Sequence, residues 1–301
     1  MAQNRPKRNW PARNVVGRDK PVLSEAERVE PTNIHQSLRI GCVKYLNARP
    51  LIHGWTGEVT LDHPAALCAQ LARRDLNVAL VSSFEFLRNP IYRIVDDISI
   101  SSAGPVYSVI VAYQGEISEA DKIELDPAAE TSVNLLRCLL SESQLNPRFT
   151  RTSASSNASP ARTRHARLLI GDQAIRFRQE HAQEFRFWDL GEQWARVVGF
   201  PFVYALWLIR PEVIDAKTIA DRLRALRDKN LANIDKLIAE EKDFDREFCV
   251  GYYRENLRFD FGEEEKQGLT EFHKRCVKLR LLPRDGLGFG TWELELARRC
   301  V

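Results

Sequence analysis

The sequence predicts an α/β fold made of two units and a helical C-terminal part. Short apolar segments alternate with segments that carry apolar residues at helical spacing, which is typical of sheets covered by helices. Two apolar segments, near Val109 and Ala205, are expected to cross between the units. The last third of the chain lacks this alternation and shows helical spacing alone.

We expect the first unit to comprise residues 38–108 and 205–284. Apolar and β-branched residues bounded by turn-forming residues predict its early strands, at residues 40–43, 58–62, 77–81 and 94–102. Apolar residues on one helical face predict its early helices, at residues 64–74 and 84–88.

The second unit is expected to span residues 109–204. Its predicted strands lie at residues 106–113, 122–125 and 167–170, with a weak strand near Phe149 and a buried crossing strand within 199–209. A helix is expected to open at Glu130, and the polar segment 146–167 is expected to be a loop.

The C-terminal part is predicted to form helices over residues 218–241 and 263–281, with the apolar spacing of packed surface helices. We interpret these helices as packing elements, in preference to any cofactor-binding role. Residues 1–37 are expected to form a polar, basic, disordered tail, and residues 285–301 a peripheral tail.

Composition excludes several classes of function. The chain of 301 residues has 44 Lys and Arg against 41 Asp and Glu, so its net charge of +3 favours neither a nucleic-acid nor a membrane-surface partner. No apolar run is long enough to span a bilayer, and the basic first twenty residues lack the apolar core of an export signal. A cytoplasmic protein is therefore expected, whereas the composition gives no indication of oligomeric state.

The cysteines and histidines are dispersed along the chain. None of the six cysteines forms a C-x-x-C pair, and several occupy apolar positions, which is typical of buried thiols in a reducing compartment. A metal site would need clustered ligands, and the six histidines are equally scattered. We therefore expect neither a metal nor another cofactor.

Asn47 lies in the polar turn that follows the first predicted strand. In open α/β sheets ligands bind at the carboxyl ends of the strands, so this amide is placed to contact a substrate. The alternative is a helix N-cap, because Pro50 is suited to the first turn of the helix that follows.

Pairs of hydroxyl residues recur after strands or at helix starts, and they are Ser82 and Ser83, Ser101 and Ser102, and Thr131 and Ser132. Neutral hydroxyl donors beside the N–H groups of a helix N-terminus can bind a carboxylate without a buried cation. A small organic anion is therefore the expected ligand, although each pair is also typical of an ordinary N-cap. Asp172 follows another strand and either orients a ligand hydroxyl or caps the next helix, and capping is the favoured interpretation.

Several blocks of sequence, in this order and spacing, resemble the chorismate dehydratases of the futalosine route to menaquinone. The resemblance covers about residues 38–283 and is carried by residues 39–41, 45–51, 79–83, 85–89, 99–108, 131–133, 168–174, 189–194 and 199–207. The sequence departs from the family at Val198, where many relatives have Thr, and in the Ser- and Arg-rich segment before Leu168. The basic tail before residue 38 is also an addition.

This resemblance implies a two-lobed, type II periplasmic-binding-protein-like fold that holds its ligand between the lobes. It implies chorismate as the substrate, loss of water to give 3-[(1-carboxyvinyl)oxy]benzoate, and no cofactor. Asn47 matches the functional Asn of the family and Ser108 a serine of the same site that would hold a carboxylate. For Ser82, Ser83, Ser101, Ser102, Thr131, Ser132 and Asp172 the match implies a position in the cleft.

Two alternatives remain open at this point. A solute-binding or sensor protein could use the same cleft to hold an organic anion without turnover, although the lack of an export signal argues against it. The sibling enzyme later in the same pathway shares the fold, but the block at residues 45–51 argues against that assignment.

Overall fold

Two five-stranded sheets organise the chain. The computed structural model describes residues 38–126, 129–151, 165–282 and 289–301. The predicted tail 1–37 and most of the polar segment before residue 165 lie outside the described residues.

The first sheet has the strand order β2-β1-β3-β10-β4. Its strands are β1 (Ile40–Val43), β2 (Val59–Asp62), β3 (Val78–Ser82), β4 (Arg93–Ser102) and β10 (Phe202–Ile209). Strand β1 runs parallel to β2 and β3, whereas β10 runs antiparallel to β3 and β4. Every residue of β1, β3 and β10 is buried, which explains their continuous apolar sequence and confirms the strands predicted here.

The second sheet has the strand order β7-β6-β8-β5-β9. Its strands are β5 (Val109–Tyr113), β6 (Lys122–Leu125), β7 (Arg148–Arg151), β8 (His165–Ile170) and β9 (Arg186–Asp189). The predicted strand 106–113 begins only at Val109, because Tyr107 adopts a left-handed φ of 66° that ends extended pairing. Strand β9 was not predicted.

The chain passes from the first sheet to the second between β4 and β5, and it returns between β9 and β10. These crossings lie near Val109 and Ala205, as predicted. Residues 38–301 nevertheless form one compact unit, so the boundaries of the two lobes stay a prediction.

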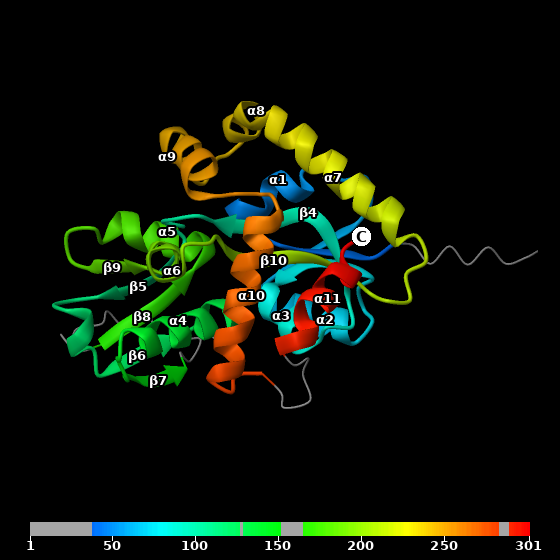
Figure 1. The fold of residues 1–301 in the computed structure, drawn as a ribbon. Helices are drawn as coiled ribbons and strands as arrows, with labels where there is room; N and C mark the ends of the chain where they lie inside the picture. The colour runs from blue at the N-terminus through cyan, green and yellow to red at the C-terminus, as the bar shows by residue number, and fades with distance from the viewer. Residues whose placement is uncertain (1–37, 127–128, 152–164, 283–288) are drawn as a thin grey trace, which may run out of the picture. The chain divides into compact units, whose positions relative to one another are not determined.

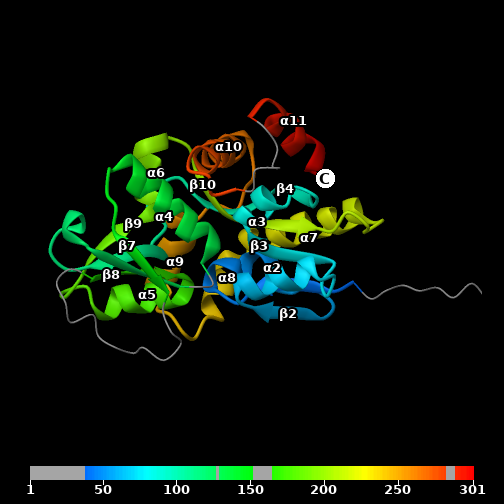
Figure 2. The ribbon, with the colours of Figure 1, turned by 90° about the horizontal axis from the view of Figure 1, so that it is seen from below.

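Helices connect and cover the strands, as Figures 1 and 2 show. The early ones are the 3-10 helix η2 (Leu46–Ala48), α1 (Arg49–Ile52), α2 (Pro64–Ala72), α3 (Ser83–Arg88), the 3-10 helix η3 (Ile117–Glu119), α4 (Glu130–Glu142), α5 (Gly171–Glu180) and α6 (Leu190–Val198). Helix α4 buries its apolar stripe and packs on α3, α6 and α10.

The C-terminal part is helical, as predicted, but it is more broken than expected. Its elements are α7 (Ala216–Ala232), α8 (Ile234–Ala239), α9 (Arg246–Gly251), the π-helical segment η4 (Tyr252–Asn256), α10 (Glu263–Lys278) and α11 (Phe289–Arg299). The predicted helix 218–241 is interrupted at Asn233, whose φ of −116° and ψ of 29° are not helical. Helix α10 packs against β10 and α4 (Figure 1).

The end of the chain is more deeply packed than a peripheral tail. Trp292 and Leu296 of α11 are buried, and Trp292 stacks on His273 of α10 with the ring centroids 4.0 Å apart. Val301 adds backbone hydrogen bonds with Ile94 and Asp96. The expectation of a peripheral tail is thus corrected for residues 289–301, because burying the large indole of Trp292 against the core is favourable.

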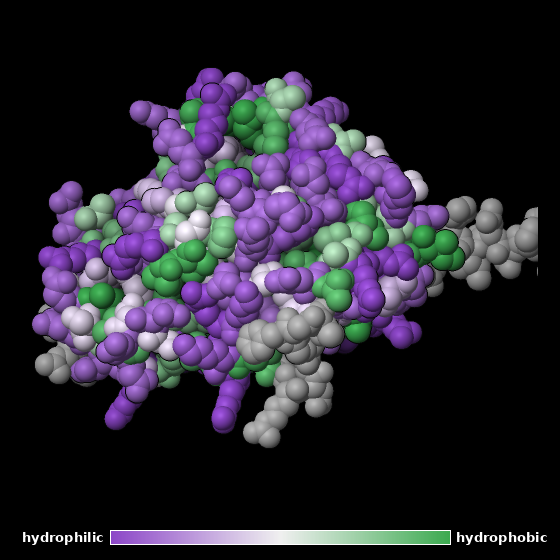
Figure 3. All heavy atoms as spheres, in the orientation of Figure 1, coloured by the Kyte–Doolittle hydropathy of each residue, from purple (hydrophilic) through white to green (hydrophobic). Residues whose placement is uncertain are grey.

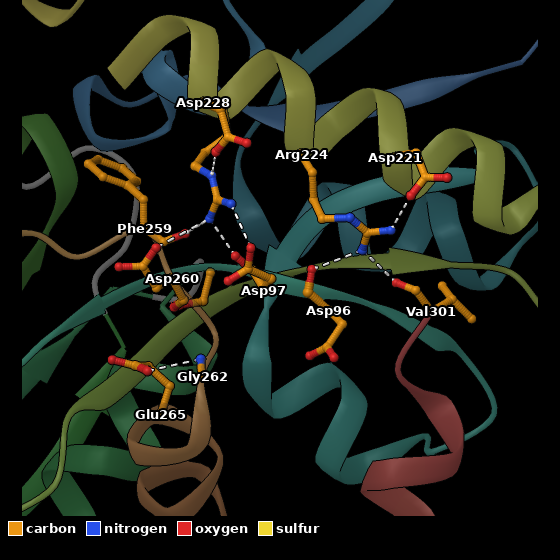
Figure 4. Close-up of polar contacts among 12 residues, drawn as sticks. Asp96, Asp97, Asp221, Arg224, Asp228, Phe259, Asp260, Gly262, Glu265 and Val301 are labelled. Carbon is orange, nitrogen blue, oxygen red and sulfur yellow. Dashed lines mark hydrogen bonds and ion pairs between the residues drawn. The ribbon is translucent and has the colours of Figure 1, made fainter. Parts of the chain in front are cut away.

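Two arginines of α7 bind this helix to strand β4, to the segment at Phe259 and to the C-terminal residue (Figure 4). The buried Arg227 guanidinium donates to Asp97, to Asp228 and to the carbonyl of Phe259. One turn earlier, Arg224 donates to the carbonyls of Asp96 and Val301. Such hydrogen-bonded pairing is the usual condition for burying a guanidinium.

The described cysteines are all free, and five of the six are buried, as predicted. The face drawn in Figure 3 is mostly hydrophilic, with small scattered apolar areas. Among the described residues, no helix is both long and apolar enough to cross a bilayer. The same residues contain no cluster of side chains that could hold a metal ion.

Candidate functional site

A cavity is lined by residues of both sheets. It lies at the ends of β1, β3, β5 and β8, beside β4 and β10 and the N-terminus of α4. It encloses about 560 Å³ of empty space, part of which is open to solvent. The polar residues in its described lining are Tyr45, Asn47, Ser82, Glu130, Thr131, Ser132 and Tyr204.

Asn47 lies in η2 and lines this cavity. The N-cap positions of η2 and α1 belong to Tyr45 and Ala48, and neither helix has a side-chain cap. Its Oδ1 is buried and has no hydrogen-bond partner among the described residues. The N-cap interpretation of Asn47 is therefore wrong, and a buried amide oxygen remains available to a ligand.

Three of the predicted hydroxyl residues line the cavity beside Asn47. Ser82 ends β3, whereas Thr131 and Ser132 lie in the first turn of α4. The Ser82 and Thr131 hydroxyls hydrogen-bond each other, and Thr131 Oγ1 also accepts the backbone N–H of Phe84 at 3.2 Å. No side chain caps α4, so the positive end of a 13-residue helix meets the cavity through these residues.

The other hydroxyls of these pairs are not among the lining residues, and each of them bonds within the protein. Ser83 Oγ donates to the carbonyl of Val203 at 2.7 Å, and Ser101 Oγ donates to that of Arg258 at 3.4 Å. Ser102 Oγ lies 3.0 Å from the hydroxyl of Tyr204, which does line the cavity.

Ser108 is fully buried and is not among the lining residues, although Val106 and Val109 near it in the sequence are. Its Oγ accepts a hydrogen bond of 2.7 Å from the Tyr252 hydroxyl. Burial raises the pKa of Tyr252, and hydrogen bonding with Ser108 and Asn47 opposes that rise. Ser108 is thus held by a buried phenol that stays protonated.

Asp172 lies in the first turn of α5 without capping that helix. Its Oδ1 instead accepts the backbone N–H of Leu46, in η2, at 2.8 Å. Burial raises the pKa of this carboxyl, and the hydrogen bond from Leu46 opposes the effect. Asp172 therefore holds the segment that carries Asn47, and the capping interpretation is wrong.

Asp189 is a supporting residue to which the sequence analysis gave no role. Its carboxylate caps α6 through the N–H groups of Gly191 and Glu192, and it also accepts those of Val106 and Tyr107 at 3.0 and 2.8 Å. One buried side chain thus fixes both crossings between the sheets. An Asp followed three residues later by Glu, as in Asp189 and Glu192, is a helix-start signal that could have revealed it.

Glu130 is the only charged residue in the described lining. Arg88 bridges its carboxylate, at 2.5 Å, and that of the buried Glu85. Burial raises the pKa of Glu130, Arg88 opposes the rise, and the negative charge of Glu85 adds to it. The sequence analysis placed no Glu at the site, so Glu130 is an addition to the predicted site residues.

Comparison with known proteins agrees with this architecture. Residues 38–278 match the model of the family described as menaquinone biosynthesis. The chain belongs to this family. A chorismate dehydratase of Thermus thermophilus is 29% identical over 253 residues, which cover 77% of this chain and 93% of that enzyme.

Solved structures of other proteins share this fold. A structural-genomics protein of Archaeoglobus fulgidus superposes with a TM-score of 0.65 at 20% identity, covering 81% of this chain and 97% of its own. The periplasmic aliphatic sulphonate binding protein of Escherichia coli superposes with a TM-score of 0.60 at 12% identity. The match covers 88% of this chain and 91% of that protein. The predicted periplasmic-binding-protein-like fold is confirmed.

Proposed function

We propose that the chain is a chorismate dehydratase, a carbon–oxygen lyase that converts chorismate to 3-[(1-carboxyvinyl)oxy]benzoate and water. The observation that carries this proposal is the match to the Thermus thermophilus enzyme over 93% of that enzyme's length. The cavity supports it, because amide and hydroxyl groups gather at one helix N-terminus and can bind a carboxylate without a buried cation.

The reaction places simple demands on the protein. A ring C–H bond gives up its proton, the electron pair enters the ring, and the ring C–O bond breaks as hydroxide leaves with a proton as water. The ring carboxylate delocalises the intermediate charge, and the enolpyruvyl carboxylate of the substrate accepts the proton. The protein then has to orient the substrate and stabilise the developing charge, which preorganised neutral donors do well.

The site residues fit these tasks. The unpartnered Oδ1 of Asn47 can accept a hydrogen bond from the ring hydroxyl, and its amide N–H group can stabilise developing charge. Ser82, Thr131 and Ser132 can hold one carboxylate at the start of α4. Ser108 can hold the other once the substrate fills the cavity. The reaction would run in the cytoplasm, where reducing conditions suit the free cysteines.

The decisive experiment incubates the purified chain with chorismate and follows the mixture by chromatography and mass spectrometry. Loss of chorismate with the appearance of an aromatic enolpyruvyl ether lighter by one water, without added nucleotide or metal, is the expected result. A heat-inactivated sample controls for spontaneous breakdown. Folded protein that leaves chorismate intact would overturn the proposal.

A second candidate is an anion-binding protein without turnover. It is favoured by the fold shared with the sulphonate-binding protein of Escherichia coli and by the absence of a charged base other than Glu130 in the described lining. Calorimetry separates the two candidates, because this one predicts saturable binding of chorismate with unchanged ligand recovered after prolonged incubation.

A further inference from the structure

Tyr252 donates a hydrogen bond to Ser108, a residue that the family resemblance places at the site, although Tyr252 does not line the cavity in the described structure. We propose that its hydroxyl is a positioning group that, by donating to Ser108 Oγ, orders a hydrogen-bond relay from Tyr252 through Ser108 to a substrate carboxylate. This inference rests on the proposed function and extends it to a residue that acts through its neighbours.

The direction of the relay follows from counting donors. A phenol has one O–H, and Tyr252 gives it to Ser108 Oγ at 2.7 Å. The phenol oxygen is then left as an acceptor. The proton of the Ser108 hydroxyl is then free for a substrate carboxylate.

Burial keeps the relay in one protonation state. Tyr252 is 1% exposed, and desolvation raises the pKa of its hydroxyl, so the group remains a neutral donor over the physiological range. It therefore sets the orientation of the Ser108 hydroxyl without adding a negative charge that would repel a dianionic substrate.

The packing around Tyr252 fixes its ring in place. The ring stacks on Phe248 at a centroid distance of 5.4 Å with an interplanar angle of 17°, and Phe248 packs on Tyr107 at 5.0 Å. Tyr107 is in turn held by Asp189 and directly precedes Ser108. Tyr252 also begins the π-helical segment η4, a local geometry that often occurs at functional sites.

The adjacent Tyr253 offers a matched comparison. It is also buried, and its hydroxyl donates to the carbonyl of Leu46 at 2.8 Å. It is part of the same segment and loses the same atom when changed to Phe, but no hydrogen bond joins it to Ser108 among the described contacts. A merely structural role for the two hydroxyls would make their substitutions behave alike.

The test is a double-mutant cycle on steady-state chorismate turnover with the full chain. Tyr252→Phe should lower kcat by about tenfold to a hundredfold with a smaller change in KM, as for outer-shell partners. In a Ser108→Ala background it should have little further effect, because the acceptor of its proton is already gone. Tyr253→Phe should add its own effect independently of Ser108.

The outcomes separate the two proposals. An inactive wild-type chain removes the proposed function, whereas an active one with wild-type kcat for Tyr252→Phe, or with additive effects of Tyr252→Phe and Ser108→Ala, overturns the relay alone. Circular dichroism and thermal melting check that each variant folds.

A replacement that preserves packing covers the case in which Tyr252→Phe does not fold. Placing 3-fluorotyrosine at position 252 alone keeps the ring and the hydroxyl but lowers the pKa of the phenol. The relay predicts a changed kcat for this protein, and an unchanged kcat overturns it.

Discussion

The carboxylate of Asp172, in α5, accepts the backbone N–H of Leu46, in η2, over a span of 126 residues in the sequence. The carbonyl of the same Leu46 accepts the hydroxyl of Tyr253. The residue before Asn47 is therefore held at both of its backbone polar groups by elements from distant parts of the chain. Gly171 completes this contact, because a Cβ there would lie 2.8 Å from the ring of Tyr45.

Removing the Asp172 carboxylate should loosen Asn47 without removing any cavity-lining group. Asp172→Ala leaves the Leu46 N–H unsatisfied and should cost about 1–3 kcal/mol in the free energy of unfolding, together with a fall in kcat. Asp172→Asn keeps an acceptor oxygen, so this variant should retain most of the stability and most of the kcat of the wild type. Denaturant titration and chorismate turnover measure the two effects, and equal behaviour of Ala and Asn variants would contradict this role.

Asn47→Ala should abolish most of the turnover while leaving the fold intact. Loss of one oriented hydrogen-bonding group in a preorganised site typically lowers kcat about a hundredfold or more. Because Asn47 caps no helix, the thermal midpoint should stay close to that of the wild type. Asn77→Ala is a suitable control, since Asn77 bonds Arg39 away from the cavity. Full activity of Asn47→Ala would exclude a catalytic role.

The sequence was sufficient to find residues that follow a strand or open a helix at the cavity. Asn47, Ser82, Thr131 and Ser132 lie where strand ends and a helix start meet the cavity, so their positions in the strand and helix pattern predict them. For Ser101 and Ser102 it was not sufficient. The side chains that face the cavity there depend on the pairing of β4 with β10, which shifts twice in register.

The tyrosines of the site were hidden for a different reason. Tyr204 and Tyr252 occur in segments whose apolar spacing predicts packing, and packing is what their rings do. Only the fold shows which hydroxyl meets a polar partner, because the partners Ser102 and Ser108 lie more than a hundred residues away in the sequence.

Glu130 should make substrate affinity depend on pH. Its pKa in the folded protein is raised, so the proton is held more tightly by the folded state, and the resulting stabilisation is lost as the pH rises through that pKa. Above it, the ionised carboxylate repels a dianionic substrate, and KM for chorismate should rise.

Glu130→Gln should give a lower KM that no longer rises with pH. The measurement is KM against pH between about 5 and 8, above the ordinary carboxyl pKa of the substrate. Glu142→Gln is the matched control, because Glu142 lies at the opposite end of the same helix and outside the described lining. An unchanged KM profile for Glu130→Gln would mean that Arg88 already neutralises the charge.

Asp189 should be the most sensitive helix cap in the protein. Its carboxylate is buried and meets four backbone N–H groups and Arg178, whereas Asp245, the cap of α9, is exposed and meets two N–H groups. Asp245→Ala should cost about 1 kcal/mol, the usual value for a lost cap. Asp189→Ala should cost at least about 3 kcal/mol, because it also leaves buried donors and a guanidinium without their partner. Parallel denaturant titrations compare the two, and similar losses would show that Asp189 acts as a cap alone.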